Sequence, residues 1–477
     1  MTRSFRILPA LLPILTAGCA TTIEPVNEAE VAGFSMALHD TLAATSPPIE
    51  GTLDSTEAVT RALQFNHSLL AERLDAALAK AETRIEAGAA LPSVLAERDE
   101  WRRNHQPYSR SSASPNYSTS SDIANLTRSI SATWNVLDFG LTLLRTSQAA
   151  DRARQKDENV RRIAAEVTES TRATYWRAVA LQALVPRLKS LDSSFEEALA
   201  LSRKAAADPL LDPSSHINFQ RDNLETRREI NDIFSSIAGA EHELRSLIAA
   251  PLDQPLLLEK RRPEETLRLP ASSARDDIAR ALKQRPEIRQ ALLDLHINET
   301  EVEATFLRLL PGAELSALFI ADSNSYLLYG DWTTLGLKFA VNLIEFARLP
   351  DRLHGLRTEE ALHRQKALAT AAAIVMQVHV ARAKVAVQLR AFRNAKEYAV
   401  SQRELLRQVK SAVSAGRLAS QQLTREEAST LLAELRATIA FGDLHAALAA
   451  YESATGETAL PEAYGEALAG QTATPEG

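Results

Sequence analysis

The chain has 477 residues, a formal net charge of −7, one cysteine, 16 glycines and 5% aromatic residues. This acidic balance leaves no nucleic-acid footprint, and one cysteine excludes an internal disulfide. Few glycines and aromatics, with abundant Ala and Leu, favour long helices over compact mixed domains.

The first 18 residues have the pattern of an export signal. Arg3 and Arg6 precede an apolar stretch from 7 to 17, which predicts a signal peptide at 1–18. Small residues then precede Cys19, an arrangement that resembles a bacterial lipobox, in which Cys19 would carry palmitate-type acyl chains. Ala20 after the cysteine points to the outer membrane. The alternative is a buried free thiol. The mature chain would keep 52 basic and 61 acidic residues, a net charge of −9.

The sequence repeats itself in the same order. Residues 61–93 align with 280–312 without a gap at an offset of 219, and 135–140 align with 342–347 at an offset of 207. Such self-similarity predicts a duplicated helix-strand-strand-helix unit in a mainly α protein with a membrane β portion. The expected organisation is an N-terminal segment at 19–54, repeats at 55–250 and 274–456, a linker at 251–273 and a tail at 457–477.

Each repeat holds two candidate strands, at about 91–103 and 125–138 in the first and about 312–322 and 332–344 in the second. The second strand of each pair alternates polar and apolar residues, as a half-buried strand does. No internal run reaches the roughly 18 apolar residues of a spanning helix, so any span would be a closed β-barrel. The alternative is a small soluble sheet packed on helices. In a barrel, Thr127, Ser129, Ser131, Thr133, Asn135, Lys338 and Asn342 would line the lumen, whereas Ile130, Trp134, Val136, Leu337, Phe339 and Val341 would face lipid.

The first strand of the first pair is the weakest of the four. Glu97, Arg98, Asp99 and Glu100 run together there, and the repeat would turn Arg98 and Glu100 toward lipid. This strand could therefore lie partly outside the bilayer.

Each second strand is expected to turn directly into a long helix. Asp138 is the predicted N-cap of the first junction and Gly140 supplies backbone freedom, with Glu345 and Ala347 at the same places in the second. Residues 356–415 lack both Gly and Pro and as one helix would be about 90 Å long. The matching helix from Leu141 should bend at Pro186.

These features together resemble the TolC-like outer membrane factors, over nearly the whole mature chain. The resemblance rests on the paired Arg-Ala-Leu to Leu-Pro helices, the two strand-to-helix junctions, Tyr175-Trp176, and Gly416 forty residues before Gly456. It implies a homotrimer in which each chain gives four strands to a shared barrel in the Gram-negative outer membrane, continued by a helical tunnel through the periplasm. The implied function is the passive exit duct of a tripartite efflux or type I secretion system, opened by a periplasmic adaptor and an inner-membrane pump.

The periplasmic tip departs from the family pattern. The family commonly has an aromatic, an arginine and two acidic residues around the tip glycine, so its acidic ring cannot be carried over. The first-half turn at 207–216 also contains two prolines. The candidate aperture residues here are Val413, Gly416, Leu418, Gln422 and Arg425.

Other function classes have less support in the sequence. The histidines lack metal-ligand spacing, and no phosphate-binding glycine loop or nucleophile elbow is present. We therefore expect no catalytic residue, no metal and no cofactor other than lipid on Cys19. The main alternative is a structural coiled-coil envelope lipoprotein without a pore, which trimer mass and channel conductance would distinguish from a duct.

Overall fold

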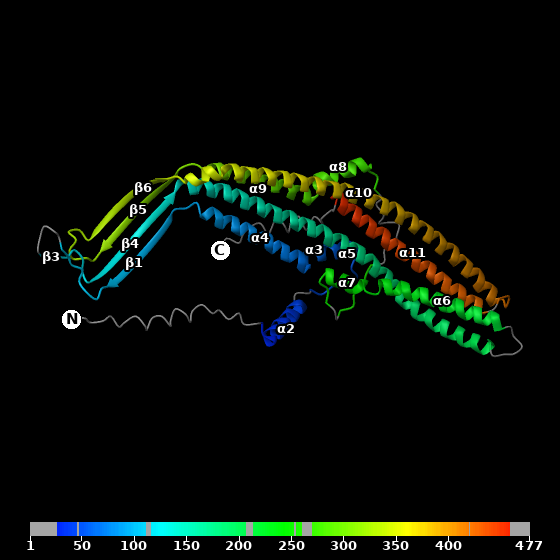
Figure 1. Cartoon of the computed structure of the whole chain (residues 1–477). Helices are drawn as coiled ribbons and strands as arrows, with labels where there is room; N and C mark the ends of the chain where they lie inside the picture. Colours follow the sequence, from blue (N-terminus) through cyan, green and yellow to red (C-terminus); the bar gives the residue numbers. More distant parts are fainter. Residues whose placement is uncertain are drawn as a thin grey trace.

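The computed structural model describes residues 26–44, 47–110, 116–206, 213–251, 254–259, 270–418 and 420–457. It is mainly helical and elongated: a sheet lies at one end, and long helices run from it side by side to the opposite end (Figure 1). The first half contains α2 (Glu28–Ala44), α3 (Ser55–Phe65), α4 (His67–Gly88), β1 (Ser93–Arg102), β2 (Ser109–Arg110), β3 (Tyr117–Ser118), β4 (Ala124–Asn135), α5 (Val136–Ala206), α6 (Pro213–Ile237) and α7 (Ala240–Leu247). The second half contains α8 (Ala274–Gln284), α9 (Pro286–Leu307), β5 (Gly312–Asp322), β6 (Asp331–Ala340), α10 (Leu343–Ser414) and α11 (Ser420–Thr455).

The elements of the two halves begin at equivalent positions. Adding 219 to the bounds of α3 and α4 gives the bounds of α8 and α9, and adding it to the first residue of β1 gives the first residue of β5. Adding 207 to the first residues of β4 and α5 gives those of β6 and α10. The equivalent helices α3 and α8 also have short polar N-caps, Asp54 in one and Ser273 in the other.

The helices form a layer with two free edges. Near the sheet, α4 packs on α5, α5 on α9 and α9 on α10, so α4 and α10 are the outer helices. Toward the far end, α6 packs on α5, α5 on α11 and α11 on α10, so α6 and α10 are the outer ones. The helix α10 therefore forms one edge along the whole layer, while α4 and α6 share the other.

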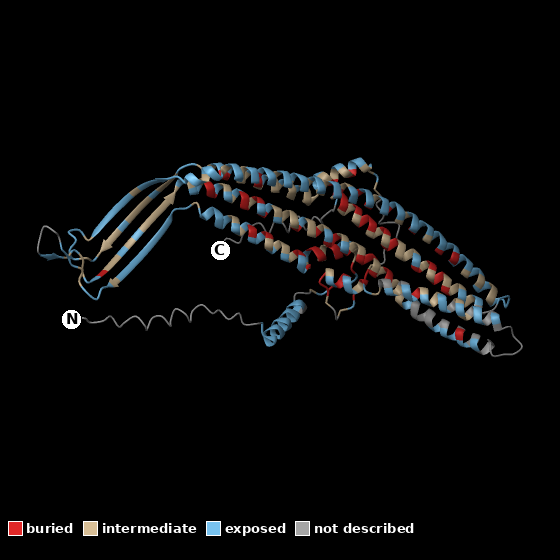
Figure 2. Ribbon diagram, in the orientation of Figure 1, coloured by how far each residue is buried: buried red, intermediate tan, exposed pale blue. Residues whose placement is uncertain are grey.

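Most buried side chains gather at the middle of the helical part, whereas the sheet has few (Figure 2). At the centre of this core, Trp176 on α5 stacks on His445 of α11 with ring centroids 4.4 Å apart and contacts Phe441 at 5.1 Å. The Tyr175 hydroxyl donates to the Leu53 carbonyl at 3.0 Å. Tyr175-Trp176, on which part of the family resemblance rests, is thus the aromatic centre of the helical core.

An isolated parallel β-bridge lies in this core, at the level of the molecule that we call the waist. Leu53 pairs in parallel with Leu258, because the Leu53 N–H donates to the Leu257 carbonyl and the Glu259 N–H donates to the Leu53 carbonyl. The segment before the first repeat and part of the expected linker at 251–273 therefore lie together.

Both predicted strand-to-helix junctions exist, but the strands end earlier than expected. Asn135 Oδ1 accepts from the N–H groups of Leu137 and Asp138, and Asn342 Oδ1 accepts from Ile344 N–H, so the asparagines cap α5 and α10. The prediction of Asp138 as N-cap is wrong, because the asparagine amide oxygen reaches the backbone N–H groups first and ends the strand ladder.

Three residues assigned to strand faces consequently lie outside the strands. Val136 is the first residue of α5, and Val341 and Asn342 lie between β6 and α10. They belong to helix junctions and not to a sheet face. The observed strands, 93–102, 124–135, 312–322 and 331–340, otherwise match the predicted ranges within a few residues.

The two longest helices are continuous through their prolines. α5 has 71 residues and continues past Pro186, and α10 has 72 residues and contains Pro350. Among the described residues, α10 also contains an 18-residue window with a mean hydropathy of 1.2, apolar enough by length and composition to cross a membrane. The sequence alone predicts no such segment, because no internal run of it holds 18 consecutive apolar residues. One face of α10 packs in the core through Ile374, Val378 and Val385.

Candidate functional site

The four long strands form one antiparallel sheet in the order β1-β4-β5-β6. Residues directly opposite one another in such a sheet share a face. Ser129 lies opposite Glu97 on one side and Ile320 on the other, and Glu314 lies opposite Lys338. The predicted lumen set on the strands therefore falls on one common face, which we call the polar face: Thr127, Ser129, Ser131, Thr133, Asn135 and Lys338.

The other face, here called the apolar face, is built from cross-strand rows. One row joins Val94, Ala132, Ala317 and Leu335. Successive rows toward the helices hold Trp134, Leu315 and Leu337, then Ala313 and Phe339. The row on the loop side holds Ala96, Ile130, Phe319 and Thr333. The structure thus places Ile130, Trp134, Leu337 and Phe339 together, as predicted from alternation alone.

The apolar face ends in a row of charge. Arg98 lies directly opposite Arg128, and this row continues to Ala321 and Asp331. Arg98 pairs with Glu100 on the same strand at 3.0 Å. The expectation that Arg98 and Glu100 share the face of the apolar residues is borne out by the register.

The loops at the strand ends fasten the two hairpins to each other. The Ser325 backbone N–H and side-chain hydroxyl donate to the two carboxylate oxygens of Asp122 at 2.6 and 2.9 Å. Asn324 Nδ2 donates to the Ser120 carbonyl at 3.0 Å. The loop of the first strand pair is therefore held to the loop of the second.

At the opposite end of the molecule, α10 turns into α11 at Gly416. Gly416 has φ +69°, its N–H donates to the Val413 carbonyl at 2.9 Å, and Arg417 N–H donates to the Ala412 carbonyl at 2.9 Å. This is a Schellman turn, in which glycine takes the left-handed conformation. Gly456 ends α11 in the same way, with φ +72°.

The five candidate aperture residues gather at this turn. Val413 is half-buried, while Leu418, Gln422 and Arg425 are exposed. Arg425 pairs with Asp222 of α6 at 3.5 Å, so it joins the α10–α11 hairpin to the neighbouring helix pair. Of the proline-containing turn predicted at 207–216, residues 207–212 lie outside the described residues.

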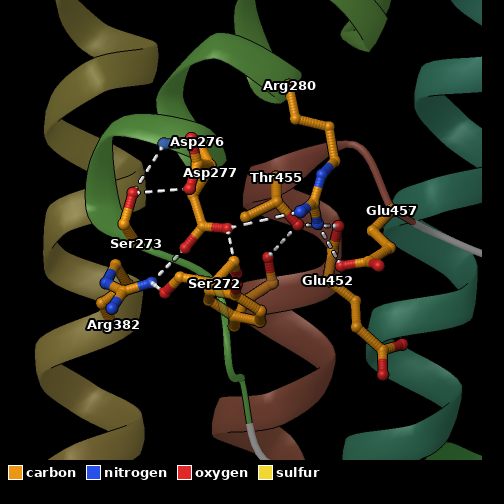
Figure 3. A network of polar contacts seen from close by, with 10 residues as sticks. Ser272, Ser273, Asp276, Asp277, Arg280, Arg382, Glu452, Thr455 and Glu457 are labelled. Carbon is orange, nitrogen blue, oxygen red and sulfur yellow. Dashed lines mark hydrogen bonds and ion pairs between the residues drawn. The ribbon is translucent and has the colours of Figure 1, made fainter.

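A buried polar network joins α8, α10 and α11 near the waist (Figure 3). Asp277 is fully buried, accepts from Ser272 Oγ at 2.6 Å and is hydrogen-bonded to Arg382 of α10. Ser272 Oγ also lies 3.2 Å from the Tyr451 hydroxyl. Burial raises the pKa of Asp277, but hydrogen bonds from Ser272, Tyr451 and Arg382 outweigh it and leave the pKa below its ordinary value. These contacts hold α8, α10 and α11 together, and we call them the clamp. The sequence did not predict them.

Comparison with known proteins finds similarity in solved structures only. No family model matches the chain, and no curated protein matches it. The solved structures that resemble it include outer-membrane channels. The Campylobacter jejuni CmeC outer membrane channel is 13% identical, with 88% of this chain and 89% of that one covered and a TM-score of 0.68. The outer-membrane channel OprN (15% identity, 87% and 95% covered, TM-score 0.63) and the open-state Neisseria gonorrhoeae MtrE channel (17%, 84% and 88%, 0.60) are similar in the same way. The chain therefore has the fold of these outer-membrane channels.

Proposed function

We propose that this protein is the outer-membrane exit duct of a tripartite efflux or type I secretion system, a passive conduit that a periplasmic adaptor and an inner-membrane pump open by docking. The observation that carries the proposal is that the helices at both free edges of the layer, α10 on one side and α4 with α6 on the other, expose apolar side chains that could meet the opposite edge of another copy.

The edge helices carry apolar side chains that the chain itself does not cover. On α10, one exposed stripe recurs at intervals of about whole helical turns and lies roughly 140–160° around the helix from the core-facing residues. The stripe consists of Leu362, Met376, Val380, Val387, Tyr398 and Leu405. A helix with two apolar faces packs between two neighbours.

The opposite edge has matching features. On α4, Leu74, Leu78 and Ile85 are exposed at intervals of four and seven, and on α6 Ile217 and Leu224 are exposed seven apart. The strands follow the same order as the helices, so β1 lies on the side of α4 and β6 lies on the side of α10. Two different, complementary edges favour head-to-tail association, which produces a closed ring when the rotation between successive copies closes. Closing the ring would also pair β6 with β1 of the next copy and remove every free strand edge, as hydrocarbon requires.

The coincident element bounds at offsets of 219 and 207 support an internal duplication, so each chain would give two equivalent hairpins to the ring. With four strands per chain, a homotrimer makes a twelve-stranded barrel and a tunnel of coiled helices. The polar face would line the lumen and the apolar face would meet lipid.

The same proposal keeps Cys19 as the lipid attachment site of an outer-membrane lipoprotein that extends into the periplasm. The support is its sequence context, with the apolar signal before it and Ala20 after it. Incorporation of labelled palmitate into the wild-type chain and not into Cys19→Ser tests this part. Retained labelling in the variant would refute it.

The duct itself is tested by mass in mild detergent and by single-channel conductance in planar bilayers. We expect a trimer that conducts. Val387→Asp places a charge in the α10 stripe and should abolish trimer formation and conductance. Val400→Asp is a matched control, because both valines are 51% exposed on α10 but lie about 140° apart around the helix.

A monomer or coiled-coil dimer without conductance would instead establish the structural lipoprotein. Equal effects of the two aspartates would refute the assigned edge.

A further inference from the structure

The row of charge that ends the apolar face has an arrangement that the duct does not require. Arg98 of β1 and Arg128 of β4 are direct cross-strand partners, and like charges placed opposite one another destabilise a sheet. Arg102 follows on the same face of β1, four residues farther toward the loops than Arg98. All three are exposed.

These arginines are only partly neutralised by the chain. Arg98 pairs with Glu100 at 3.0 Å, and 62% of its side chain stays exposed. Within the described residues, neither Arg102 nor Arg128 has a carboxylate within ion-pair distance. Asp331 belongs to the same row but lies on β6, at the far edge of the sheet. The local charge is therefore positive, with three arginines and one nearby carboxylate, that of Glu100.

The place of this row along the strands indicates how deep it would lie in a bilayer. It lies eight residues along the strand from the row of Phe339, which is about 27 Å along the strand and about 20 Å across a bilayer at the usual tilt. That span matches an apolar band roughly 25 Å tall. The register places the arginines at the loop end of β1 and β4, where hydrocarbon would give way to headgroups. This is the end of the sheet away from the helices (Figure 1).

We propose that Arg98, Arg102 and Arg128 form a binding site for the phosphate groups of an anionic membrane lipid in the outer leaflet. A phosphate between Arg98 and Arg128 would accept hydrogen bonds from both guanidinium groups and would turn their mutual repulsion into a shared attraction. The acyl chains would lie on the next row of the apolar face, which holds Ile130 and Phe319. This inference rests on the proposed function, since it needs the apolar face to meet lipid.

The test measures lipid binding by the full-length assembly in mild detergent, using native mass spectrometry to count retained lipid. The probes are bisphosphorylated lipid A and the same lipid without phosphates, with inorganic phosphate as competitor. We expect the wild type to bind the phosphorylated form at least tenfold more tightly, and millimolar inorganic phosphate to leave the lipid bound.

The decisive variant is the double substitution Arg98→Gln and Arg128→Gln, which should abolish the preference for phosphorylated lipid. Arg103→Gln is the matched control, because Arg103 stacks over the Trp101 ring, with its guanidinium carbon 4.2 Å from the ring centroid, and Trp101 belongs to the polar face. It should bind as the wild type does. Arg128→Gln alone keeps the Arg98–Glu100 pair and provides the measurement if the double variant fails to assemble.

The following outcomes would overturn the proposal. The double variant could bind phosphorylated lipid as tightly as the wild type, or inorganic phosphate could displace the lipid, which would leave a general anion patch. Alternatively, Arg98→Gln and Asp331→Asn could each break the trimer, which would assign Arg98 to an ion pair across the subunit seam. A wild type that forms conducting trimers but shows no phosphate preference refutes this site alone, whereas a wild type without trimers refutes the duct.

Discussion

His445 gives the helical core a specific sensitivity to acid. Its ring stacks on Trp176 and meets Phe441 edge to face, with the ring centroids 4.4 Å apart in both contacts. Burial, and secondarily the positive charge of Arg172, lowers its pKa to about 4 from an ordinary 6.5. The unfolded chain therefore takes up a proton at a pH where the folded chain stays neutral, and stability falls as pH decreases below about 6.5.

The size of this effect follows from the two pKa values. The full shift corresponds to about 3.4 kcal/mol, and about 2 kcal/mol of it is already lost at pH 5 relative to pH 8. His445→Phe keeps an aromatic ring in the stack but cannot be protonated. The variant should lose this part of the pH dependence, whatever its stability at pH 8.

The assay is guanidinium unfolding of the detergent-solubilised protein, followed by helical circular dichroism between pH 8 and pH 5. Carboxylates titrate in both proteins, so the quantity compared is the difference between wild type and variant at each pH. His296→Phe, at an exposed site on α9, is the control and should leave the wild-type profile unchanged. Parallel stability profiles for wild type and His445→Phe would refute the reasoning.

Further predictions concern the clamp, the caps and the tip. Asp277→Ala should destabilise by about 3–5 kcal/mol, because it leaves Arg382 without its buried partner, and a double-mutant cycle with Arg382→Ala that gives no coupling energy would contradict this. Asn342→Ala should cost about 1 kcal/mol in unfolding free energy through the lost cap of α10, and an unchanged unfolding midpoint would exclude that role. Gly416→Ala should lower the free energy of unfolding by about 1 kcal/mol, because Gly416 has a positive φ. Gly355→Ala should raise it by about 0.5–1 kcal/mol, because Gly355 lies inside α10 with open space around its Cβ position. Changes of the same sign in both variants would refute the backbone argument.

The sequence predicted the elements that local pattern determines. Period-two alternation located β4 and β6 and their faces, and the repeat offset located α8 and α9. The strand ends were missed because alternation continues through Val341 while the backbone has already turned. The available signal was the asparagine three residues before an acid, Asn135 before Asp138 and Asn342 before Glu345, which is a capping pattern.

Features that depend on long-range pairing could not be predicted in this way. The opposition of Arg98 and Arg128 depends on register across a loop of more than twenty residues, which the loop sequence does not determine. Ser272 and Tyr451 meet although 179 residues separate them, and neither lies in a recognisable motif. The helix α2 was not expected, since the segment 19–54 was assigned no secondary structure.

The waist contact at Leu53 has a mechanical consequence. One phenol, that of Tyr175, holds both sides of the contact, because it donates to the Leu53 carbonyl at 3.0 Å and reaches the Glu259 carbonyl at 3.3 Å. Rotating α5 about its own axis at this level would break these bonds together with the stacking of Trp176. The helix α5, which runs from Val136 to Ala206, is thus anchored partway along its length. Torsion applied at its Ala206 end would meet this anchor before it reached β4, the strand that leads into α5 at its other end.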